Sequence, residues 1–491
     1  MNEFGRNVKR VMVIFLFLFI SLIAYIAYFQ MFKAPELAKD NNNKRVWAER
    51  NEVIRGTIYD RNSNALTSGE RTGSLTQSRS YLKGDLYVHA LGYINTTYGL
   101  TGLEEKYDDV LTTYTSTKES IFKNFSIDKL VEEFKNRGKD DSEKVGNGII
   151  TTLDEAIQQA AYNALGDNRG AAVALNPKTG EVLAMVSKPT YDPNNLAAAI
   201  SAANEGSAEN SPLINRAING KYPPGSTFKV VTTASALENI PGVQYRTFDD
   251  TKGYIQISDK YSLSNDSGSA NGYVDLKGAF LASSNVVFGG ILAYQELGSE
   301  TLKGTSEKFG FNEKIPADGF NISQSDFPLE TYPGVIAQSG IGQGAILATP
   351  MQMALVASTI ANNGVMMKPK LVNTIVDSQM NVVKEIQSKE YKKVISEEHA
   401  SIIKDYMKTY VDNKVYGSWY FFQGTNACGK TGTASVLDAN GNAASPHGWF
   451  IGFAPADDPV IAVAVIVENG GYGAQSAAPV AGEMINAALN R

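Results

Sequence analysis

The first clear pattern along the chain is a uniformly apolar stretch, Val11–Phe29, which contains no charged residue. As a helix rising about 1.5 Å per residue, it matches the thickness of a bilayer core. Tyr25 and Tyr28 suit the interface with water at its outer end. A cleaved signal peptide is the alternative. However, the stretch is longer than the apolar core of a usual signal peptide, and no small-x-small cleavage site follows it. We therefore expect a retained membrane anchor, although basic residues on both sides leave its orientation open.

The region from residue 151 to residue 491 alternates between strand-like and helix-like patterns. Apolar runs at 170–175 and 181–186 flank a Pro/Gly turn, which predicts a β-hairpin, and runs at 448–455 and 460–468 predict two further strands. Thr152 and Glu155 have the spacing of a capping box and predict a helix start there. Helix-like sequence fills most of the interval and also ends the chain at 481–491. This arrangement predicts an α+β domain with an antiparallel sheet and a helical subdomain.

Residues 33–150 differ in composition and pattern from the rest of the chain, which predicts a separate, partly extended region. Ile54–Asp60 has the pattern of a strand, and residues 140–148 have the composition of an exposed connector. Apolar spacing over Ile127–Phe134 predicts a helix that stops near Gly138. The expected organisation is therefore a tail and anchor over 1–32, this region over 33–150, and the α+β domain over 151–491.

Composition excludes several kinds of function. The net charge of −6 and the pI near 5.4 argue against nucleic acid as the main partner. One cysteine excludes an intrachain disulfide framework and a cysteine-cluster metal site, and three histidines make a His-rich zinc site a poor prediction. Few histidines also leave few bases for a Ser–His–Asp triad, so serine chemistry would use another base, for which lysine is the natural choice.

A serine and a lysine three residues apart share one face of a helix, within hydrogen-bonding reach. The pattern S-x-x-K occurs five times, and most occurrences must be chance. Ser226/Lys229 differs because Tyr222–Gly225, with two prolines and a glycine, forces a tight turn into a helix that begins at the serine. A serine at a helix N-terminus lies where backbone N–H groups favour developing negative charge. A simple N-cap serine with a solvated lysine is the alternative. The other four pairs are Ser80/Lys83, Ser120/Lys123, Ser126/Lys129 and Ser401/Lys404.

Two further short patterns follow in the chain. Ser283-Ser-Asn285 has apolar flanks, which would bury its polar side chains at a cost unless they serve one another or a ligand. Lys430-Thr-Gly-Thr433 has the character of a strand edge, able to pair with an extended peptide while Lys430 holds a carboxylate. A helix cap and a surface turn, respectively, are the alternatives. Ser269-Ala-Asn271 and Lys178-Thr-Gly180 repeat the patterns in a polar loop and in the hairpin turn.

The order S-x-x-K, S-x-N, K-T-G resembles the signature of penicillin-binding proteins and serine β-lactamases. With its anchor and juxtamembrane region, the chain is similar to class B penicillin-binding proteins, the monofunctional transpeptidases of bacterial wall synthesis. The resemblance makes residues 33–150 a pedestal or dimerisation-type region. They leave too little room for the glycosyltransferase domain of bifunctional relatives, and 112–149 match no motif. The remaining stretches that resemble the family are Arg55–Asn62, Gly102–Glu104, Asn176–Met185, Gly340–Gly344, Thr349–Gln352 and Gly448–Ala454.

The resemblance implies a penicillin-binding/β-lactamase-like fold and roles for the first two motifs. Ser226 would attack the carbonyl of the penultimate D-Ala of a stem peptide. Lys229 would be the general base, neutral because burial and the charge of Lys430 lower its pKa. Ser283 would relay a proton to the leaving D-Ala, and Asn285 would hold the substrate amide and Lys229.

The same resemblance assigns the third motif to substrate binding. Lys430, Thr431 and Thr433 would grip the terminal carboxylate, and Gly432 would admit a close ligand backbone. Backbone N–H groups of Ser226 and Thr433 would form the oxyanion hole. No metal or organic cofactor is implied. Cys428 shares a strand face with Lys430; we favour a small packing residue there over a thiol that borders the cleft.

The implied partners are peptidoglycan stem peptides, β-lactams as covalent inhibitors, and a multi-span glycan polymerase of the SEDS type. The substrate lies outside the cytoplasmic membrane, so the resemblance places the catalytic domain outside and the short tail inside. A D,D-carboxypeptidase or a β-lactamase would use the same residues with water as acceptor. A β-lactam sensor or scaffold without turnover is the alternative from a different class.

Overall fold

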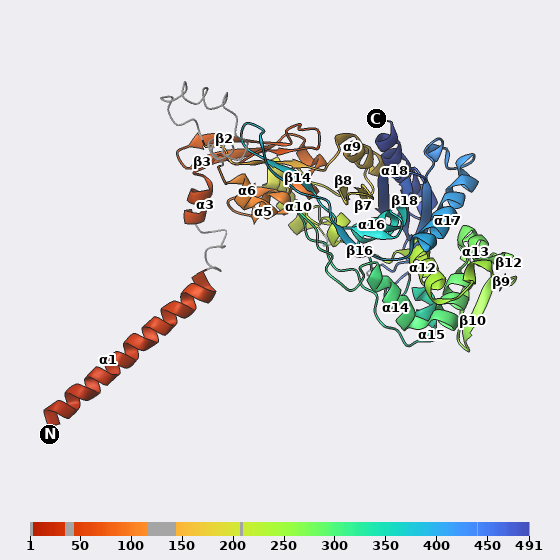
Figure 1. Cartoon of the computed structure of the whole chain (residues 1–491), viewed down its shortest axis with the longest axis horizontal. Coiled ribbons are helices and arrows are strands. Elements are labelled where there is room, and N and C mark those ends of the chain that lie inside the picture. The colour runs from red at the N-terminus through yellow and green to blue at the C-terminus, as the bar shows by residue number, and fades with distance from the viewer. Residues whose placement is uncertain (1–2, 35–43, 115–143, 207–209, 439, 491) are drawn as a thin grey trace.

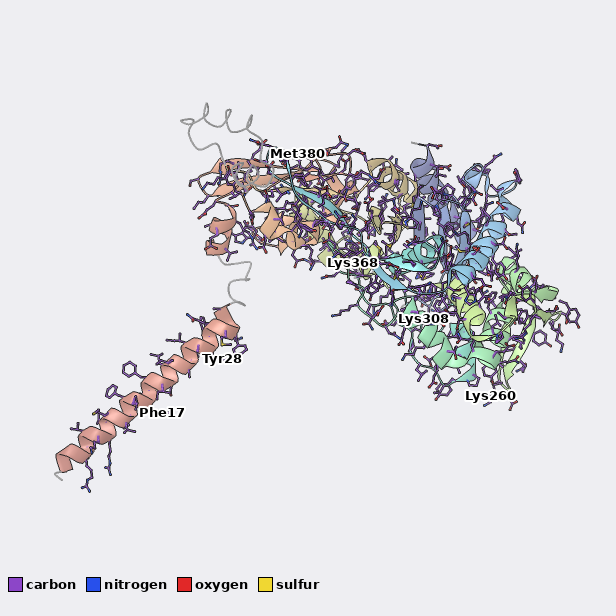
Figure 2. The ribbon with its side chains drawn as sticks, viewed as in Figure 1. Phe17, Tyr28, Lys260, Lys308, Lys368 and Met380 are labelled. Atoms are coloured by element: carbon purple, nitrogen blue, oxygen red, sulfur yellow. The ribbon has the colours of Figure 1, made fainter. Side chains whose placement is uncertain are left out.

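The computed structural model describes residues 3–34, 44–114, 144–206, 210–438 and 440–490. Its N-terminal helix α1 (Glu3–Tyr28) continues into the π-helical turn Phe29–Lys33 (Figure 1). Side chains such as Phe17 and Tyr28 project from α1 and are exposed (Figure 2). Within the described residues, Gly5–Lys33 is the one helix long and apolar enough to cross a membrane.

The centre of the large domain is a five-stranded antiparallel sheet in the order β17-β18-β19-β7-β8. The hairpin and the two later strands predicted from the sequence are all present in it, because continuous apolar runs suit strands that are covered on both faces. β17 is a terminal strand of the sheet. The strand bounds are β7 (Gly170–Leu175), β8 (Val182–Lys188), β17 (Cys428–Ala434), β18 (His447–Ala454) and β19 (Ile461–Val467).

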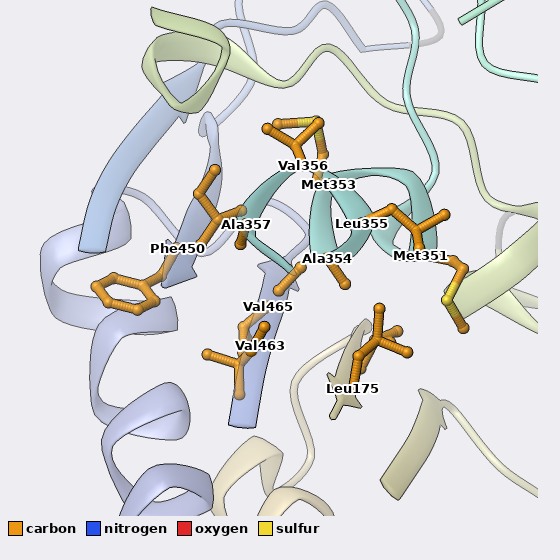
Figure 3. Packing of buried hydrophobic residues seen from close by; sticks show 14 of the residues in the cluster. Leu175, Met351, Met353, Ala354, Leu355, Val356, Ala357, Phe450, Val463 and Val465 are labelled. Atoms are coloured by element: carbon orange, nitrogen blue, oxygen red, sulfur yellow. The ribbon is translucent and has the colours of Figure 1, made fainter. Parts of the chain in front are cut away.

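Helices cover the sheet. α9 (Glu155–Leu165) and α18 (Gly473–Leu489) pack against each other and against the strands. α16 (Pro350–Ala361) is buried along its whole length and packs on β7, β18 and β19. Figure 3 shows hydrophobic residues of this helix, among them Ala354 and Ala357, beside Val463 and Val465. These side chains belong to the main hydrophobic core, whose burial is the dominant favourable contribution to folding.

The predicted starts of α9 and of the C-terminal helix are wrong. Asp154, not Thr152, caps α9: its carboxylate accepts from the backbone N–H groups of Ala156 and Ile157. The Thr152 hydroxyl instead donates to the carbonyl of Val182 on β8, 2.7 Å away. The C-terminal helix begins at Gly473 rather than near residue 481, because its small first residues pack directly on β18, where a Cβ on Gly473 would lie 2.2 Å from the Trp449 carbonyl oxygen.

Helices recur through the segment between β8 and β17, as expected, but it also contains strand pairs that the sequence analysis missed, two of them β-ribbons within residues 247–275. These are β9 (Thr247–Asp250) paired with β12 (Gly272–Asp275), and β10 (Tyr254–Ser258) paired with β11 (Tyr261–Ser264). The helices are α10 (Leu196–Glu205), α11 (Arg216–Asn219), α12 (Lys229–Asn239), α13 (Leu276–Ala282), η8 (Val286–Leu297), α14 (Gly298–Lys308), α15 (Pro333–Ser339) and α17 (Glu397–Val415).

The N-terminal region shares a sheet with the large domain. β1 (Ile58–Tyr59) pairs with β6 (Gly148–Thr151), which pairs with β14 (Val372–Val376) and through it with β15 (Val382–Glu385). The domain boundary expected between residues 150 and 151 falls within β6 and stays a prediction. The strand expected over Ile54–Asp60 is reduced to β1 and a single bridge from Ile54 to Val145. The helix predicted over Ile127–Phe134 lies outside the described residues.

The remaining elements are short. They are α3 (Lys44–Arg50), β2 (Thr67–Gly73), β3 (Thr76–Tyr81), α4 (Val88–Leu91), β4 (Ile94–Asn95), β5 (Gly99–Leu100), α5 (Gly102–Lys106), α6 (Asp108–Leu111), β13 (Val365–Met367) and β16 (Glu390–Lys393).

Candidate active site

Ser226 lies in a tight turn wedged against the terminal strand of the sheet. Residues Gly225–Phe228 form a 3₁₀ turn, and α12 begins only at Lys229, three residues later than the sequence predicts. Gly225 has φ +54°, a conformation that favours glycine, and its N–H donates to the Gly342 carbonyl at 2.9 Å. A Cβ on Gly225 would lie 2.8 Å from the Thr433 carbonyl oxygen. The backbone of the Ser226 turn and that of Thr433 are therefore in direct contact.

Lys229, the first residue of α12, directs its amine at the Ser283–Asn285 segment. Its Nζ lies 2.6 Å from the Ser283 carbonyl oxygen, 3.2 Å from Ser283 Oγ and 2.8 Å from Asn285 Oδ1. The side chain is fully buried. Burial, and then the nearby Lys430, hold the pKa of Lys229 well below its usual value, against the smaller opposing effects of Asp250 and Asp266.

The predicted hydrogen bond between Ser226 and Lys229 is not present: among the described residues, the Ser226 hydroxyl has no hydrogen-bond partner. The reason is local, because the serine lies in the 3₁₀ turn while the lysine opens the α-helix, so the ideal three-residue helical spacing does not apply. Ser226 is partly exposed, whereas the Lys229 side chain is fully buried.

The Ser283–Asn285 segment joins α13 to η8. Ser283 ends α13 in the left-handed conformation (φ 55°, ψ 40°), which is uncommon for a residue other than glycine. This conformation places its hydroxyl between two amines, 3.2 Å from Lys229 Nζ and 3.0 Å from Lys430 Nζ. Asn285 Nδ2 donates to the Ser264 carbonyl at 2.9 Å, which orients its Oδ1 toward Lys229.

Lys430, on β17, completes the group. Its Nζ donates to Ser283 Oγ and to the Thr431 carbonyl at 3.1 Å, and it lies 4.6 Å from the centre of the Tyr410 ring. The side chain is fully buried. Burial, and then the charge of Lys414, lower the pKa of Lys430 to about 7. Two lysines and one serine therefore form a continuous chain of polar contacts, in which the hydroxyl is shared by both amines.

The other three residues of the K-T-G-T motif have distinct surroundings. The Thr431 hydroxyl lies 2.5 Å from the Tyr410 hydroxyl on α17, whereas Thr433 is partly exposed beside the Ser226 turn. A Cβ on Gly432 would lie 2.8 Å from the Pro224 carbonyl oxygen and 3.1 Å from the Thr227 backbone nitrogen. The close neighbour that requires glycine here is therefore the turn that carries Ser226.

A buried polar network behind Ser283–Asn285 was missed by the sequence analysis. Both carboxylate oxygens of Asp250 accept from Asn265 Nδ2 at 2.9 Å, and Asp250 Oδ2 also accepts from the Ser284 hydroxyl at 2.7 Å. Asn265 Oδ1 in turn accepts from the backbone N–H groups of Asn285 and Val286. Asp250 is 1% exposed. Its only sequence signal is its place in a polar, turn-rich stretch, which does not distinguish it from surface residues.

We predict that Asp250→Asn slows acylation by penicillin about tenfold, equivalent to about 1.4 kcal/mol, because a neutral amide binds three donor groups less strongly than a carboxylate. Loss of the negative charge also lowers the pKa of Lys229 further, so the acidic limb of the rate profile should move to lower pH. Stopped-flow measurement of the acylation rate across pH gives both the slowing and the shift of the acidic limb. Asp249→Asn, on the exposed face of the same strand, is the matched control; equal slowing in both variants would contradict the prediction.

We predict a smaller effect for Tyr410→Phe. This change removes the hydroxyl that contacts Thr431 but keeps the ring beside Lys430. The expected loss is about 1 kcal/mol of unfolding free energy, with acylation slowed about fivefold, as for one buried hydrogen bond. Denaturant unfolding and acylation kinetics measure these. Tyr406→Phe, one turn earlier on α17, is the control, and a Tyr410→Phe protein with wild-type kinetics would refute a positioning role for this hydroxyl.

A second buried cluster fixes the approach to Ser226. Glu468 accepts from Arg216 Nε at 2.8 Å and from the Tyr222 hydroxyl at 2.7 Å. Trp449 donates from Nε1 to the Pro223 carbonyl at 3.0 Å and is fully buried. The segment before Ser226 is therefore held at Tyr222 by Glu468, the residue after β19, and at Pro223 by Trp449 of β18.

Cys428 does not border the cleft. Its side chain is fully buried, with Sγ 3.7 Å from the Lys404 carbonyl oxygen of α17, and burial raises the pKa of the thiol. It packs beneath the site, as the favoured interpretation held. Within the described residues there is no group of three or more His, Cys, Asp or Glu side chains that could hold a metal ion.

The structure brings together Ser226, Lys229, Ser283–Asn285 and Lys430–Thr433 and leaves the competing motifs elsewhere. Ser80 lies on β3, Ser401 lies on α17, and Lys178–Gly180 forms the β7–β8 turn. Ser120/Lys123 and Ser126/Lys129 lie outside the described residues. Ser269–Asn271 belongs to the loop before β12, although Asn271 Nδ2 reaches Asp250.

An antiparallel sheet with a terminal K-T-G strand, a helical subdomain and a serine beside a buried lysine define a serine enzyme of the penicillin-recognising class. A family model for the penicillin-binding protein transpeptidase domain matches residues 170–486, and a model for the dimerisation domain of penicillin-binding protein A matches 55–139. The chain therefore belongs to the penicillin-binding protein transpeptidase family, and its fold is the one expected from the sequence.

Similar proteins cover nearly the whole chain. The peptidoglycan D,D-transpeptidase PbpA of Mycolicibacterium smegmatis is 33% identical, with 99% of both chains covered. The peptidoglycan D,D-transpeptidase MrdA of Acinetobacter baumannii is 30% identical over 82% of this chain and 64% of its own. The ceftriaxone acyl-enzyme complex of penicillin-binding protein A from Mycobacterium tuberculosis superposes with a TM-score of 0.79 at 30% identity, covering 90% of this chain and all of that one.

Proposed function

We propose that Ser226 is the nucleophile of a peptidoglycan D,D-transpeptidase, and that Lys229 is its general base. The enzyme is a serine D,D-transpeptidase that β-lactams acylate, in keeping with its family and with the acyl-enzyme complexes of its relatives. The observation that carries the residue roles is the contact of Ser283 Oγ with both lysine amines. It supplies a path for a proton between the nucleophile side and the leaving-group side of the cleft.

In acylation, Ser226 Oγ attacks the carbonyl carbon of the penultimate D-Ala and its proton passes to Lys229. A neutral lysine amine has two N–H groups and one lone pair. The N–H groups are held by the Ser283 carbonyl and Asn285 Oδ1, and the lone pair is left for a hydroxyl proton. When the peptide bond breaks, Ser283 hands a proton to the departing D-Ala amine and is reprotonated from the lysine side.

Substrate binding falls to β17 and to Asn285. As a terminal strand, β17 leaves backbone groups free to pair with an extended peptide. Lys430 and the Thr433 hydroxyl hold the terminal carboxylate, and Asn285 holds the substrate amide. Thr431 contributes to the same strand, although its hydroxyl is engaged by Tyr410. The N–H groups of Ser226 and Thr433, whose backbones touch through Gly225, form the oxyanion hole.

In deacylation, an amine from a neighbouring stem peptide attacks the ester on Ser226 and forms the cross-link. Because the stem peptides lie outside the cytoplasmic membrane, we infer that α1 anchors the chain with its catalytic domain on the outer side. The same inference makes a multi-span glycan polymerase of the SEDS type a partner, contacted through α1 and the N-terminal region. The charges that flank the apolar stretch Val11–Phe29 do not by themselves decide the orientation.

One experiment tests the function and separates it from its rivals. The full chain is incubated with labelled penicillin, digested, and the label is located by mass spectrometry; we expect it on the peptide that contains Ser226, with a lifetime of minutes or longer. A donor peptide ending in D-Ala-D-Ala, supplied with an acceptor amine, should then give a cross-linked product. Release of the label within seconds would indicate a β-lactamase, and a hydrolysed product alone would indicate a carboxypeptidase.

A further inference from the structure

A second lysine lies over the aromatic ring that faces Lys430. The Lys414 amine is 4.3 Å from the centre of the Tyr410 ring, and the Lys430 amine is 4.6 Å from the same centre. One ring of α17 therefore carries two amines, one from its own helix and one from β17. The face of a ring attracts a cation at this range, so each contact is favourable by itself. Together they hold two like charges no more than about 9 Å apart.

The surroundings of Lys414 fix the position of its amine. The residue lies in the last turn of α17, and its amine is also 5.7 Å from the centre of the Trp419 ring. Trp419 packs edge-on against Tyr410, and both rings are buried. The lysine is itself only partly buried, and its contact with solvent favours the charged form. Lys414 is therefore a cation held against two packed rings.

Neither amine has a carboxylate partner. Within the described residues, the Lys414 amine has no hydrogen-bond or ion-pair partner. The polar groups that face the Lys430 amine are all neutral or basic: Lys229 from α12, Ser283 after α13, and Tyr410 and Lys414 from α17. Opposite Lys430 on β18 stands the apolar Ile451.

The charge of Lys430 is therefore opposed by a neighbouring charge and balanced by none. Buried like charges repel strongly because little water lies between them. This agrees with the lowered pKa of Lys430, about 7, which burial causes first and the charge of Lys414 second. A carboxylate that enters the cleft would supply the missing negative charge.

We propose that Lys414 is a positioning residue of the carboxylate site and acts on Lys430 through the Tyr410 ring that the two amines share. Its charge keeps Lys430 partly neutral in the empty cleft. When a substrate carboxylate arrives, its negative charge outweighs that of Lys414, and Lys430 takes up a proton from solvent. Binding of the carboxylate is thereby coupled to protonation of Lys430. The part played by Lys430 rests on the proposed function.

Lys414→Met tests this role, because methionine keeps an apolar stem beside the two rings but carries no charge. The rate constant for acylation by penicillin, itself a carboxylate, is measured below saturation with the full chain in detergent. In the wild type this constant should fall as the pH rises past about 7. In Lys414→Met the fall should occur about one pH unit higher, as expected for removal of a like charge at this range.

The decisive comparison is at alkaline pH. At about pH 8.5 Lys414→Met should be acylated at least about threefold faster than the wild type, whereas at about pH 6 the two should differ less than about twofold. Damage to the fold would slow acylation at every pH and could not produce this gain. Lys414→Gln removes the same charge and gives the test if the methionine variant does not fold.

Two matched variants serve as controls. Lys414→Arg keeps a cation over the ring and should retain the wild-type pH profile. Lys408→Met removes a charge of the same helix that is paired with Asp412, and it should also retain that profile. A basic limb that stays in place when Lys414 loses its charge would overturn the inference. A limb that moves equally in either control would overturn it as well.

The same samples separate this inference from the proposed function. Labelling of Ser226 by penicillin is measured in each, and a wild-type chain that cannot be acylated refutes the proposed function. A wild-type rate without any basic limb contradicts the role proposed for Lys430, and with it this inference. A chain that is acylated normally and has the limb, but keeps it unmoved in Lys414→Met, refutes only the role of Lys414.

Discussion

Ser226→Ala is expected to abolish covalent labelling by penicillin and all cross-linking of stem peptides. The reason is chemical: the other hydroxyl of the Gly225–Phe228 turn, that of Thr227, is buried and donates to the Pro224 carbonyl at 2.7 Å, so it cannot replace the nucleophile. The fold should be unaffected, because the Ser226 hydroxyl has no hydrogen-bond partner among the described residues and is partly exposed. Intact mass after incubation with penicillin, together with the thermal midpoint, measures both effects.

Ser201→Ala, an exposed serine on α10, is the matched control and should label like the wild type. A cell that depends on this protein would be expected to survive with the control and not with Ser226→Ala. Survival with Ser226→Ala would instead support a β-lactam sensor or scaffold, in which binding without turnover is sufficient. A label that persists in purified Ser226→Ala would place the nucleophile elsewhere.

Lys229→Met is expected to reduce the acylation rate about a thousandfold, within the range for loss of a general base. Methionine keeps the apolar stem that lies within the buried face of α12 but cannot accept a proton. It also removes the contacts that hold Ser283 and Asn285, so binding of substrate should weaken as well. Rapid-quench acylation at saturating penicillin separates the loss of rate from the loss of affinity.

The pH dependence gives an independent check. Burial and Lys430 lower the pKa of Lys229, so its neutral, basic form persists to lower pH than for an exposed lysine. The wild-type rate should therefore fall as acid protonates this amine, and this acidic limb should be absent in Lys229→Met. Lys430 acts in the opposite sense: with its pKa lowered to about 7, it loses the charge that binds the carboxylate as pH rises. Lys229→Met should retain that basic limb, and an unchanged acidic limb would rule out Lys229 as the base.

Much of the central sheet could be predicted because its strands are short, fully apolar runs bounded by turn residues, as at 170–175 and 461–467. The ribbons β9–β12 and β10–β11 could not, because their solvent-facing residues are polar and their burial depends on neighbours distant in sequence. For the same reason the start of α18 was placed too late. Its first turns are helical because they pack on β18, not because their sequence favours a helix.

The residues of the candidate site also divide into those that the sequence predicts and those that only the structure reveals. Three short motifs with unusual context pointed to Ser226, Ser283 and Lys430, and the structure brings these residues together. Asp250 and Tyr410 carry no motif: their importance comes from contacts with Ser284 and Thr431, which lie 34 and 21 residues away. Pairings of this kind are set by the fold, and a single sequence contains no record of them. Gly432 is a similar case. The sequence analysis expected this glycine to admit a ligand backbone, but its close neighbour in the structure is the Pro224 carbonyl of the turn that carries Ser226.

The sheet that joins the N-terminal region to the catalytic domain has a practical consequence. β6 lies between β1 and β14, so it holds a strand from residues 58–59 against one from 372–376. A protein shortened to start at residue 151 would lose β1 and nearly all of β6 and would bare the edge of β14, inviting strand exchange between molecules. Attempts to isolate the acylating half should therefore keep the chain from before Ile58.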